Sequence, residues 1–297
     1  EALFPRFKKK AKQDVKLYFP KNNKGDWKIW RHKLMIPTLK QVRLKEFGYL
    51  PVGVPVISGT VSCKAGRCYV SVVVDIDEKS KYNKDLEASY QAITDGVGID
   101  LGVKDLAIVS DGKVFKNIHK HSKVKRLEKR LRRAQRRLSR KYAFQKKKGG
   151  KTAAASANID KQRRKVQKLY QRMDHIREDY ENKVIHEIVK QHPRFMTVED
   201  LNVKGMIKNR HLAKAVAAQR FHRLLTKLKR KAESVGIEFR IVDRFYPSSK
   251  TCHACGHIHK GLKLKDRVYV CPACGYTEDR DINASLNLRD AEEYRIA

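Results

Sequence analysis

The sequence has few acidic residues and no long hydrophobic run. Of its 297 residues, 32 are Asp or Glu and 68 are Lys or Arg, which leaves a net charge of +36. A charge of this sign and size favours a polyanionic partner, and nucleic acid is the default one. There is no stretch of about 18 apolar residues, no signal peptide and no basic amphipathic segment with an aromatic face. We therefore expect nucleic acid as a partner, and no membrane.

Enough apolar residues remain to form a folded core. They make up 41% of the chain, which at this length is sufficient for about two domains. Up to residue 95, β-branched and aromatic residues between Gly, Pro and Asn turns predict a small β-barrel or sheet. The expected strands are residues 15–19, 27–30, 41–44, 56–62 and 68–75. A polar linker or short helix is expected at residues 78–91.

Six cysteines are present, and four of them form two equally spaced pairs. Cys252 and Cys255 are separated by two residues, as are Cys271 and Cys274, and a Gly follows each pair. This spacing lets neighbouring thiolates reach one tetrahedral Zn²⁺. Four unrelated buried cysteines, or disulfides, are weaker alternatives because nothing else suggests an oxidising compartment. Four sulfur ligands leave no open coordination position, so we predict a structural zinc in a small ribbon.

The other two cysteines, Cys63 and Cys68, flank a turn in the N-terminal region. Contact across the two strands is expected there, but the gap of four residues is poor zinc spacing. We therefore interpret this pair as ordinary strand residues.

From residue 96 the pattern changes to apolar strands that carry acidic residues. Strands are expected at residues 97–102, 105–110 and 113–115, the last two joined by the turn Asp111-Gly112. Several acids fit simple local roles. We expect helix caps at Asp200 and Asp279, and turn residues at Asp95, Asp105 and Asp111.

Three other acids stand at the ends of predicted apolar elements. Asp100 lies in the first of these strands, Glu199 closes a strand of residues 195–198, and Asp281 begins a helix of residues 282–288. A carboxylate in such a place usually faces a metal, a cation or a donor cluster, because desolvating it unpaired is costly. Asp100 alone fits a strand-end cap as well as a metal ligand. The three together predict a site for two Mg²⁺ ions about 4 Å apart that hydrolyses phosphodiesters.

Two long helical patterns between residues 119 and 192 predict a helical hairpin. Apolar residues recur at three- and four-residue spacing in both, and Gly149-Gly150 separates them. The first helix has an almost purely basic face with one acid, Glu128. A solvated face normally mixes both signs, so this face favours phosphate contact over mere solubility. The candidate nucleic-acid-binding residues are Lys123, Arg126, Arg130, Arg133 and Arg137.

A third amphipathic helix is expected from about residue 212 to residue 235, followed by a strand at residues 237–242. Its apolar side should cover the sheet. That side consists of Val216, Phe221, Leu224, Leu225 and Leu228. Beyond the strand, Phe245 and Tyr246 fit either base stacking or a core position, and the core is the commoner role beside a strand end. We assign them no binding role.

Four motifs occur in a characteristic order. They read Gly98-Ile-Asp100-Leu-Gly102, Val198-Glu199-Asp200-Leu201, Pro247-Ser-Ser-Lys-Thr-Cys252-His-Ala-Cys255-Gly256 and Asp279-Arg-Asp281-Ile-Asn283-Ala-Ser-Leu-Asn287. From residue 96 to the end, this order resembles the RuvC-type nuclease of TnpB. TnpB proteins are transposon-encoded RNA-guided DNA endonucleases related to type V CRISPR effectors. Upstream, Pro5-Arg-Phe-Lys8 resembles the wedge domain of that family.

The resemblance implies a fold and a set of site residues. The expected fold is α/β: an RNase H-like (RuvC) nuclease domain at residues 96–297, with a helical hairpin insertion at 119–192 and a zinc ribbon at 247–278. A partial wedge-type β-barrel at residues 1–95 precedes it. The implied catalytic Mg²⁺ ligands are Asp100, Glu199 and Asp281, and the implied zinc ligands are Cys252, Cys255, Cys271 and Cys274.

The resemblance also implies a function, that of an RNA-guided DNA endonuclease of an insertion-sequence transposon. A guide RNA from the transposon end would pair with one strand of a double-stranded target DNA, so that base pairing supplies the specificity. The expected location is the cytoplasm of a prokaryotic cell, in association with the nucleoid. Two alternatives stay open: a transposase that performs strand transfer, and a cleavage-inactive RNA-guided DNA-binding protein. The presence of all three acids counts against the second.

The chain opens at Glu1, without the first wedge strand and helical recognition domain that the family carries upstream of the Pro5 motif. We therefore expect a fragment of a longer protein. The missing parts would bear on target recognition, and the nuclease centre would be present.

Overall fold

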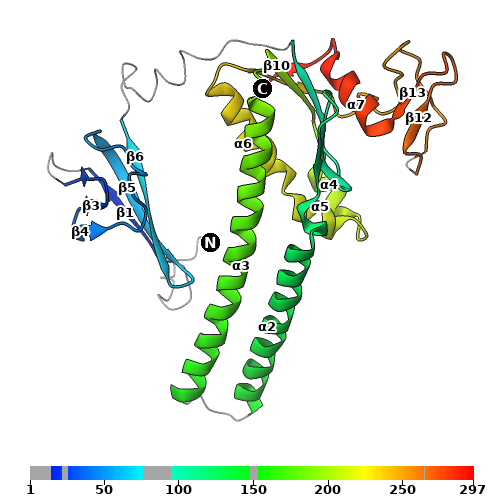
Figure 1. Cartoon of the computed structure of the whole chain (residues 1–297). Coiled ribbons are helices and arrows are strands. Elements are labelled where there is room, and N and C mark those ends of the chain that lie inside the picture. Colours follow the sequence, from blue (N-terminus) through cyan, green and yellow to red (C-terminus); the bar gives the residue numbers. More distant parts are fainter. Residues whose placement is uncertain (1–14, 22–25, 76–94, 148–152, 264) are drawn as a thin grey trace, which may run out of the picture. The chain divides into compact units, whose positions relative to one another are not determined.

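The computed structural model describes the chain except for residues 1–14, 22–25, 76–94, 148–152 and 264. The chain divides into two compact units (Figure 1). One comprises Glu1–Ala88 and Arg130–Arg172, and the other Ser89–Lys129 and Met173–Ala297. The linker expected at residues 78–91 and the wedge-like motif at residues 5–8 lie outside the described residues.

The first unit contains two antiparallel sheets of three strands each. One has the order β1 (Val15–Pro20), β5 (Val56–Lys64) and β6 (Arg67–Val74), and the other consists of β2 (Lys28–Ile29), β3 (Lys33–Ile36) and β4 (Lys40–Arg43). Both sheets contribute to one core that contains Trp27, Leu34 and Val56. The five strands predicted in this region are present, and β3 is an additional one.

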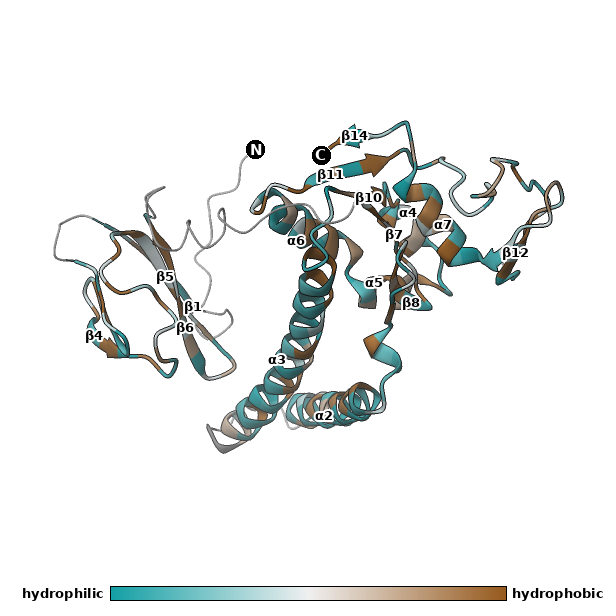
Figure 2. Cartoon of the chain, turned by 45° about the horizontal axis from the view of Figure 1, so that its top comes forward, coloured by the Kyte–Doolittle hydropathy of each residue, from teal (hydrophilic) through white to brown (hydrophobic). Residues whose placement is uncertain are grey.

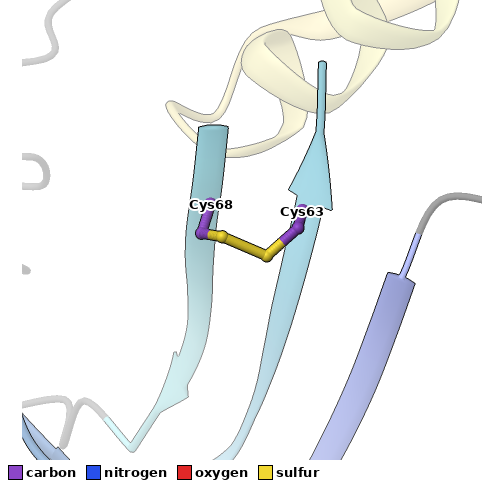
Figure 3. The surroundings of a disulfide bond; sticks show 2 residues. All are labelled: Cys63 and Cys68. Carbon is purple, nitrogen blue, oxygen red and sulfur yellow. A yellow bond between two sulfur atoms is a disulfide. The ribbon is translucent and has the colours of Figure 1, made fainter. Parts of the chain in front are cut away.

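A disulfide joins Cys63 of β5 to Cys68 of β6 (Figure 3). The two residues are register partners with Cα atoms 4.0 Å apart, because Ala65 and Gly66 both adopt positive φ and close a tight hairpin. Our interpretation of this pair as ordinary strand residues is therefore wrong. The spacing is poor for zinc, but it places the two side chains opposite each other once the hairpin forms.

The second unit is built on a mixed sheet of six strands in the order β14, β11, β10, β7, β8, β9. Strand β7 runs parallel to β10, which runs parallel to β11, and the other neighbours pair antiparallel. Because β7 and β10 are parallel, their carboxyl ends meet at one edge of the sheet. The strands are β7 (Val97–Asp100), β8 (Asp105–Val109), β9 (Val114–Lys116), β10 (Phe195–Glu199), β11 (Glu238–Val242) and β14 (Arg295–Ile296).

Two of the acids expected in turns of this sheet differ in their roles. Asp111 lies in the turn before β9, where its carboxylate accepts a hydrogen bond of 2.9 Å from Lys113 N, as predicted. Asp105 instead begins β8, is buried, and lies 3.8 Å from the ammonium group of Lys116. The turn role expected for Asp105 is therefore wrong.

The predicted helical pair is present as α2 (Ser122–Lys147) and α3 (Ala153–Val189), preceded by the short 3₁₀ helix η2 (Ile118–Lys120). Figure 2 shows both long helices as mostly hydrophilic with bands of hydrophobic residues. Among the apolar positions predicted in these helices, Val124, Leu127, Val166 and Leu169 are buried. No helix among the described residues combines the length and apolar character needed to cross a membrane.

The single helix predicted at residues 212–235 is wrong, because the structure has two. These are α5 (Ala213–Gln219) and α6 (Phe221–Glu233), separated by Arg220 with a left-handed φ of 55°. The Arg220 guanidinium forms an ion pair with Asp174 of α3, a tertiary contact that the helical period does not reveal.

The predicted apolar side nevertheless covers the sheet, because Phe221, Leu224 and Leu228 are buried in its main core. A further helix, α4 (Val203–Lys208), was not predicted. Its N-cap is Asn202, whose side chain accepts a hydrogen bond from Gly205 N. The cap role expected for Asp200 is therefore wrong.

The C-terminal part contains a small hairpin, β12 (Val268–Val270) and β13 (Thr277–Asp279), and the helix α7 (Arg280–Arg289). The cap predicted at Asp279 is confirmed: its carboxylate accepts hydrogen bonds from Asp281 N at 2.9 Å and Ile282 N at 3.3 Å. This cap fixes the first turn of α7.

Candidate functional site

Helix α7 packs directly on the central strand β7. Gly98 permits this contact, because a Cβ atom at this position would overlap the carbonyl oxygen of Ser285. Asp281 precedes Ser285 by one helical turn, about 6 Å, and Asp100 follows Gly98 by two strand residues, about 7 Å. These two distances along the helix and the strand are similar, and the charge of Asp281 raises the pKa of Asp100. The start of α7 therefore lies beside the end of β7.

Glu199 reaches the same edge from the neighbouring strand. Ile99 of β7 is the register partner of Val198 of β10, so Asp100 and Glu199 follow at adjacent positions of two parallel strands. Aligned residues of parallel strands point to the same face of the sheet. Asp100, Glu199 and Asp281 therefore lie at the carboxyl edge of the sheet, and their role as metal ligands stays a prediction.

The pKa of Asp100 records this convergence. The pKa of Asp100 is raised from 3.8 to about 8, first by burial and then by the negative charges of Glu199 and Asp281. The nearby charge of Arg280 and the backbone N–H of Leu101 act in the opposite sense. A cluster of carboxylates that is this poorly compensated fits a divalent cation, because the cation would supply the missing positive charge.

The second carboxylate, Glu199, has one clear partner. Burial raises the pKa of Glu199, and a hydrogen bond donated by the Ser248 hydroxyl to its carboxylate lowers it in part. Ser248 is itself buried, and its carbonyl oxygen accepts a 2.7 Å hydrogen bond from the Asn287 side chain. Ser248 therefore fixes the orientation of Glu199 from the loop that follows β11.

Two arginines hold the third carboxylate. The Asp281 carboxylate lies 3.1 Å from a guanidinium nitrogen of Arg280 and 3.8 Å from one of Arg267. Arg280 N also donates a 2.9 Å hydrogen bond to the carbonyl oxygen of Arg267, which ties the start of α7 to the hairpin before it. Asp281 is thus positioned by charge as well as by the helix cap.

The three carboxylates share an edge, but their oxygens do not all approach one another closely. In the described part of the chain, the four cysteines are the only group of three or more metal-ligating side chains whose ligand atoms all lie within 4.8 Å.

The four cysteines come together from two matching turns. Gly256 N donates to Cys252 O at 2.9 Å, Gly275 N donates to Cys271 O at 3.0 Å, and both glycines adopt positive φ. Across the site, Cys252 Sγ lies 3.7 Å from Cys274 Sγ, and Cys255 Sγ lies 3.6 Å from Cys271 Sγ. This set could hold a tetrahedral metal, as the spacing predicts.

One thiol of this cluster, Cys271, is prepared for ionisation, whereas the pKa of Cys252 and that of Cys255 are raised. Burial opposes the ionised form of Cys271, but backbone N–H groups of Cys274 and Ala273 and the neighbouring thiols lower its pKa to about 6. The fully buried ring of Tyr269 packs against Cys252 and Cys271 and forms the small apolar core of the ribbon.

Two asparagines connect the four-cysteine ribbon to α7. The Asn283 side chain donates to Thr251 O at 2.8 Å and accepts from His253 N at 3.1 Å. The Asn287 side chain donates to Thr251 O at 2.7 Å. Both residues are buried and lie one turn apart on the helix that carries Asp281. The ribbon therefore rests on the same helix as a candidate metal ligand.

The basic face predicted on α2 is exposed along the helix. Its candidate residues are Lys123, Arg126, Arg130, Arg133 and Arg137, and all five are solvent-exposed. None of them forms an ion pair with a carboxylate among the described residues, and the one acid of the helix, Glu128, faces His119 at 3.8 Å. The charge of this face is thus available to a polyanion.

Sequence reasoning assigned no role to several residues that support the site. Ser248, Asn283 and Asn287 belong to the motifs quoted above, which is the signal that could have found them. Their burial is visible only in the structure. Arg267 and Arg280 gave no signal because basic residues occur throughout this chain.

Two family models match the chain. The OrfB_IS605 family, described as "Probable transposase", matches residues 71–210. The Cas12f1-like TNB domain family matches residues 221–288. Together the two matches include the strands that carry Asp100 and Glu199, the ribbon and most of α7.

Several curated proteins are similar in sequence. A Streptomyces pristinaespiralis protein named "Putative RNA-guided DNA endonuclease" is 31% identical over 288 residues, which are 96% of this chain and 64% of that protein. "Putative RNA-guided DNA endonuclease InsQ" of Escherichia coli K12 is 30% identical over 302 residues, 97% of this chain and 68% of InsQ. The chain thus spans about two thirds of the length of these relatives.

A solved structure described as "Cryo-EM structure of CRISPR-Cas12f Ternary Complex" matches with a TM-score of 0.47 and 15% identity. The match covers 96% of this chain and 60% of that one.

Proposed function

The chain belongs to the TnpB (OrfB_IS605) family, and from this membership we propose that it is an RNA-guided DNA endonuclease of an insertion-sequence transposon. The observation that carries the proposal is the convergence of Asp100, Glu199 and Asp281 on one edge of the sheet. The relatives named as endonucleases agree with this activity. The proposed partners are a guide RNA from the transposon end and a double-stranded target DNA.

The proposed nuclease fold is RNase H-like. A central strand with parallel neighbours on one side and an antiparallel hairpin on the other supports this assignment. The proposed domain is residues 96–297, with the helical insertion at 119–192 and the ribbon at 247–278. Residues 1–95 would be the partial wedge domain, a proposal supported by the two antiparallel sheets of the first unit.

Asp100, Glu199 and Asp281 would hold the catalytic Mg²⁺, because Mg²⁺ prefers carboxylate oxygens as ligands. When bound, Mg²⁺ supplies Lewis-acid activation of water and stabilises the leaving oxygen. Ser248 orients Glu199, and the Asp279 cap with Arg280 orients Asp281. These residues set the geometry in which a phosphodiester is cut.

The four cysteines would bind a structural Zn²⁺, supported by the close approach of all four sulfur atoms. The exposed residues Lys123, Arg126, Arg130, Arg133 and Arg137 of α2 would contact phosphates of the guide or target. Base pairing would then supply sequence specificity. The proposed location is the prokaryotic cytoplasm, in association with the nucleoid.

The test is cleavage by the chain expressed beside its native transposon end. RNA that copurifies is sequenced, and a plasmid that carries the matching target is offered with Mg²⁺. Asp100→Ala should abolish cleavage and leave the copurified RNA nearly unchanged. Asp111→Ala, which removes a turn carboxylate, should keep both. Cleavage by Asp100→Ala at the wild-type rate would refute the assignment.

A transposase remains the second candidate, since the same carboxylates can serve strand transfer and the family model is described as a transposase. The same assay separates the two, because a transposase joins DNA ends while a nuclease leaves them free. RNA-guided binding without either product would identify a cleavage-inactive DNA-binding protein.

A further inference from the structure

The loop between β11 and the ribbon presents an aromatic ring to solvent beside the carboxylate edge. Phe245 is 86% exposed, the largest exposed fraction among the large hydrophobic side chains that the structure describes. The core position favoured for it by the sequence is therefore wrong. Its neighbour Tyr246 differs, since it packs against Val242 and Leu288 and donates a 3.0 Å hydrogen bond to Asn287 O.

Hydrogen bonds fix the backbone on both sides of Phe245. Phe245 N donates to the Asp243 carboxylate at 2.8 Å, and Tyr246 N donates to Asp243 O at 3.1 Å. Beyond the ring, Lys250 N and Thr251 N donate to Pro247 O at 2.9 and 3.0 Å. The exposed ring thus stands on a turn that is anchored at both ends.

Both ends of this loop contact the strand end that carries Glu199. Val242 is the register partner of Glu199, and Ser248 donates to the Glu199 carboxylate. Phe245 is three residues along the chain from each of them, so its Cα lies within about 10 Å of both. An exposed aromatic ring therefore stands within one or two nucleotides of the proposed cleavage site.

We propose that Phe245 stacks on a base of single-stranded DNA as that strand enters the carboxylate site. A flat exposed ring that directly follows the charged residues Asp243 and Arg244 suits the face of a base, whereas a protein partner would require a contiguous apolar patch. The net charge of +36 selects a polyanionic strand. The strand is single because bases in a duplex already stack on each other. This inference rests on the proposed nuclease function and names how its substrate is held.

The test measures stacking separately from cleavage. The full chain carrying Asp100→Ala, which blocks cutting, is mixed with single-stranded oligonucleotides that contain one 2-aminopurine at successive positions. Its fluorescence falls when the base stacks on an aromatic ring. High salt is used because it suppresses phosphate contacts more than stacking. One position should be quenched, and adding Phe245→Ala or Phe245→Leu should abolish that quenching and weaken binding about 5- to 150-fold.

Two further variants control the measurement. Phe245→Trp should keep the quenching, because it keeps an aromatic face. Ile296→Ala removes another exposed apolar side chain, 70% exposed on β14, and should leave affinity unchanged. Unchanged quenching and affinity in Phe245→Ala or in Phe245→Leu would overturn the proposal.

Cleavage by the chain with Asp100 intact then separates the two proposals. If the wild-type chain does not cut but quenching depends on Phe245, the nuclease proposal fails and stacking stands. If Phe245→Ala cuts with unchanged KM and shows unchanged quenching, stacking fails and the nuclease stands.

Discussion

Asp100 is the residue at which electrostatics and the proposed chemistry oppose each other most strongly. Its surroundings raise its pKa to about 8 because the carboxylate is buried beside two others. Ionising Asp100 therefore destabilises the folded chain unless a cation is bound. The ionisation of Asp100 can therefore be followed by its effect on folding stability as well as by its effect on catalysis.

We predict that Asp100→Asn changes the pH dependence of stability in buffer without divalent salts. Between about pH 4 and pH 8 the folded wild-type chain binds more protons at Asp100 than the unfolded chain, so its stability falls as pH rises, by at most on the order of 5 kcal/mol. Asp100→Asn lacks this slope, so its melting temperature should exceed that of the wild type at pH 8 and match it near pH 4.

Added Mg²⁺ should narrow the difference at pH 8, because binding to the folded wild type stabilises it. Asp111→Asn, in an exposed turn, is the control and should retain the wild-type slope. The prediction would be contradicted if the melting temperatures of Asp100→Asn and the wild type changed equally with pH across this range.

At the residue scale, the sequence identified the groups whose chemistry is unusual for their context. Acids at the ends of apolar strands and paired cysteines are costly to bury without a ligand, so Asp100, Glu199 and Cys252 were recognisable. Partners whose role depends on tertiary position were not: Ser248 and Asn287 are ordinary polar residues until the fold buries them. The Cys63–Cys68 bond was missed because hairpin register, not spacing, brings the two sulfurs together.

At the scale of elements, the contact between α7 and β7 positions Asp281. We predict that Gly98→Ala moves α7 away from the strand, because the new Cβ would overlap the Ser285 carbonyl. Overpacking of this kind costs roughly 1–3 kcal/mol, and cleavage per folded molecule should fall by at least about tenfold, since a shift near 1 Å has such an effect. Thermal melts and single-turnover cleavage measure the two effects.

Gly112→Ala separates stability from geometry. Gly112 has a φ of 85° and no atom near its missing Cβ, so the substitution strains a turn and leaves α7 in place. It should lower the melting temperature but keep the cleavage rate of the folded fraction. A wild-type rate for Gly98→Ala would show that the close contact is irrelevant to the site.

The ribbon provides a second prediction at this scale. Cys252→Ser should lower the zinc content measured by elemental analysis and unfold the ribbon, since zinc contributes folding free energy on the order of 10 kcal/mol in small modules. Cys63→Ser is the matched control: it breaks the disulfide in the other unit and should keep the zinc. Full zinc content in Cys252→Ser, or full stability under strong chelation, would contradict a structural zinc.

Long periodic elements were predictable, and short or interrupted ones were not. The apolar periods of α2 and α3 and the β-branched runs of β7 and β10 are strong local signals. The break at Arg220 is accompanied by an ion pair with Asp174, which lies far away in sequence. Strands of two or three residues, such as β12 and β14, form only because a neighbouring strand is present.

On the scale of the whole molecule, the excess of positive charge should dominate affinity. We predict that RNA binding weakens steeply with salt and that Arg126→Gln, Arg130→Gln and Arg133→Gln together reduce the slope of log K against log salt by about 2, near 0.7 for each lost phosphate contact. Fluorescence anisotropy with the copurified RNA across a salt series measures this slope.

The control removes the same charge from a different surface. Arg163, Lys183 and Lys229 each pair with an acid on their own helix, so replacing all three with Gln should change the slope much less. Equal slopes for the two triple variants would mean that net charge, and not the face of α2, determines binding. Composition indicates nucleic acid as the class of partner, but it cannot choose between surfaces because basic residues occur throughout the chain.

The two asparagines that join the ribbon to α7 restrict how this protein can be recombined with its relatives. A chimera that exchanges the ribbon alone would need to preserve the backbone groups of Thr251 and His253 that Asn283 engages. Exchanging the segment from β11 through α7 as one block would keep those bonds intact. Chimeras that keep the hydrogen bonds between the ribbon and α7 should therefore preserve activity. Chimeras whose junction breaks these hydrogen bonds should lose activity.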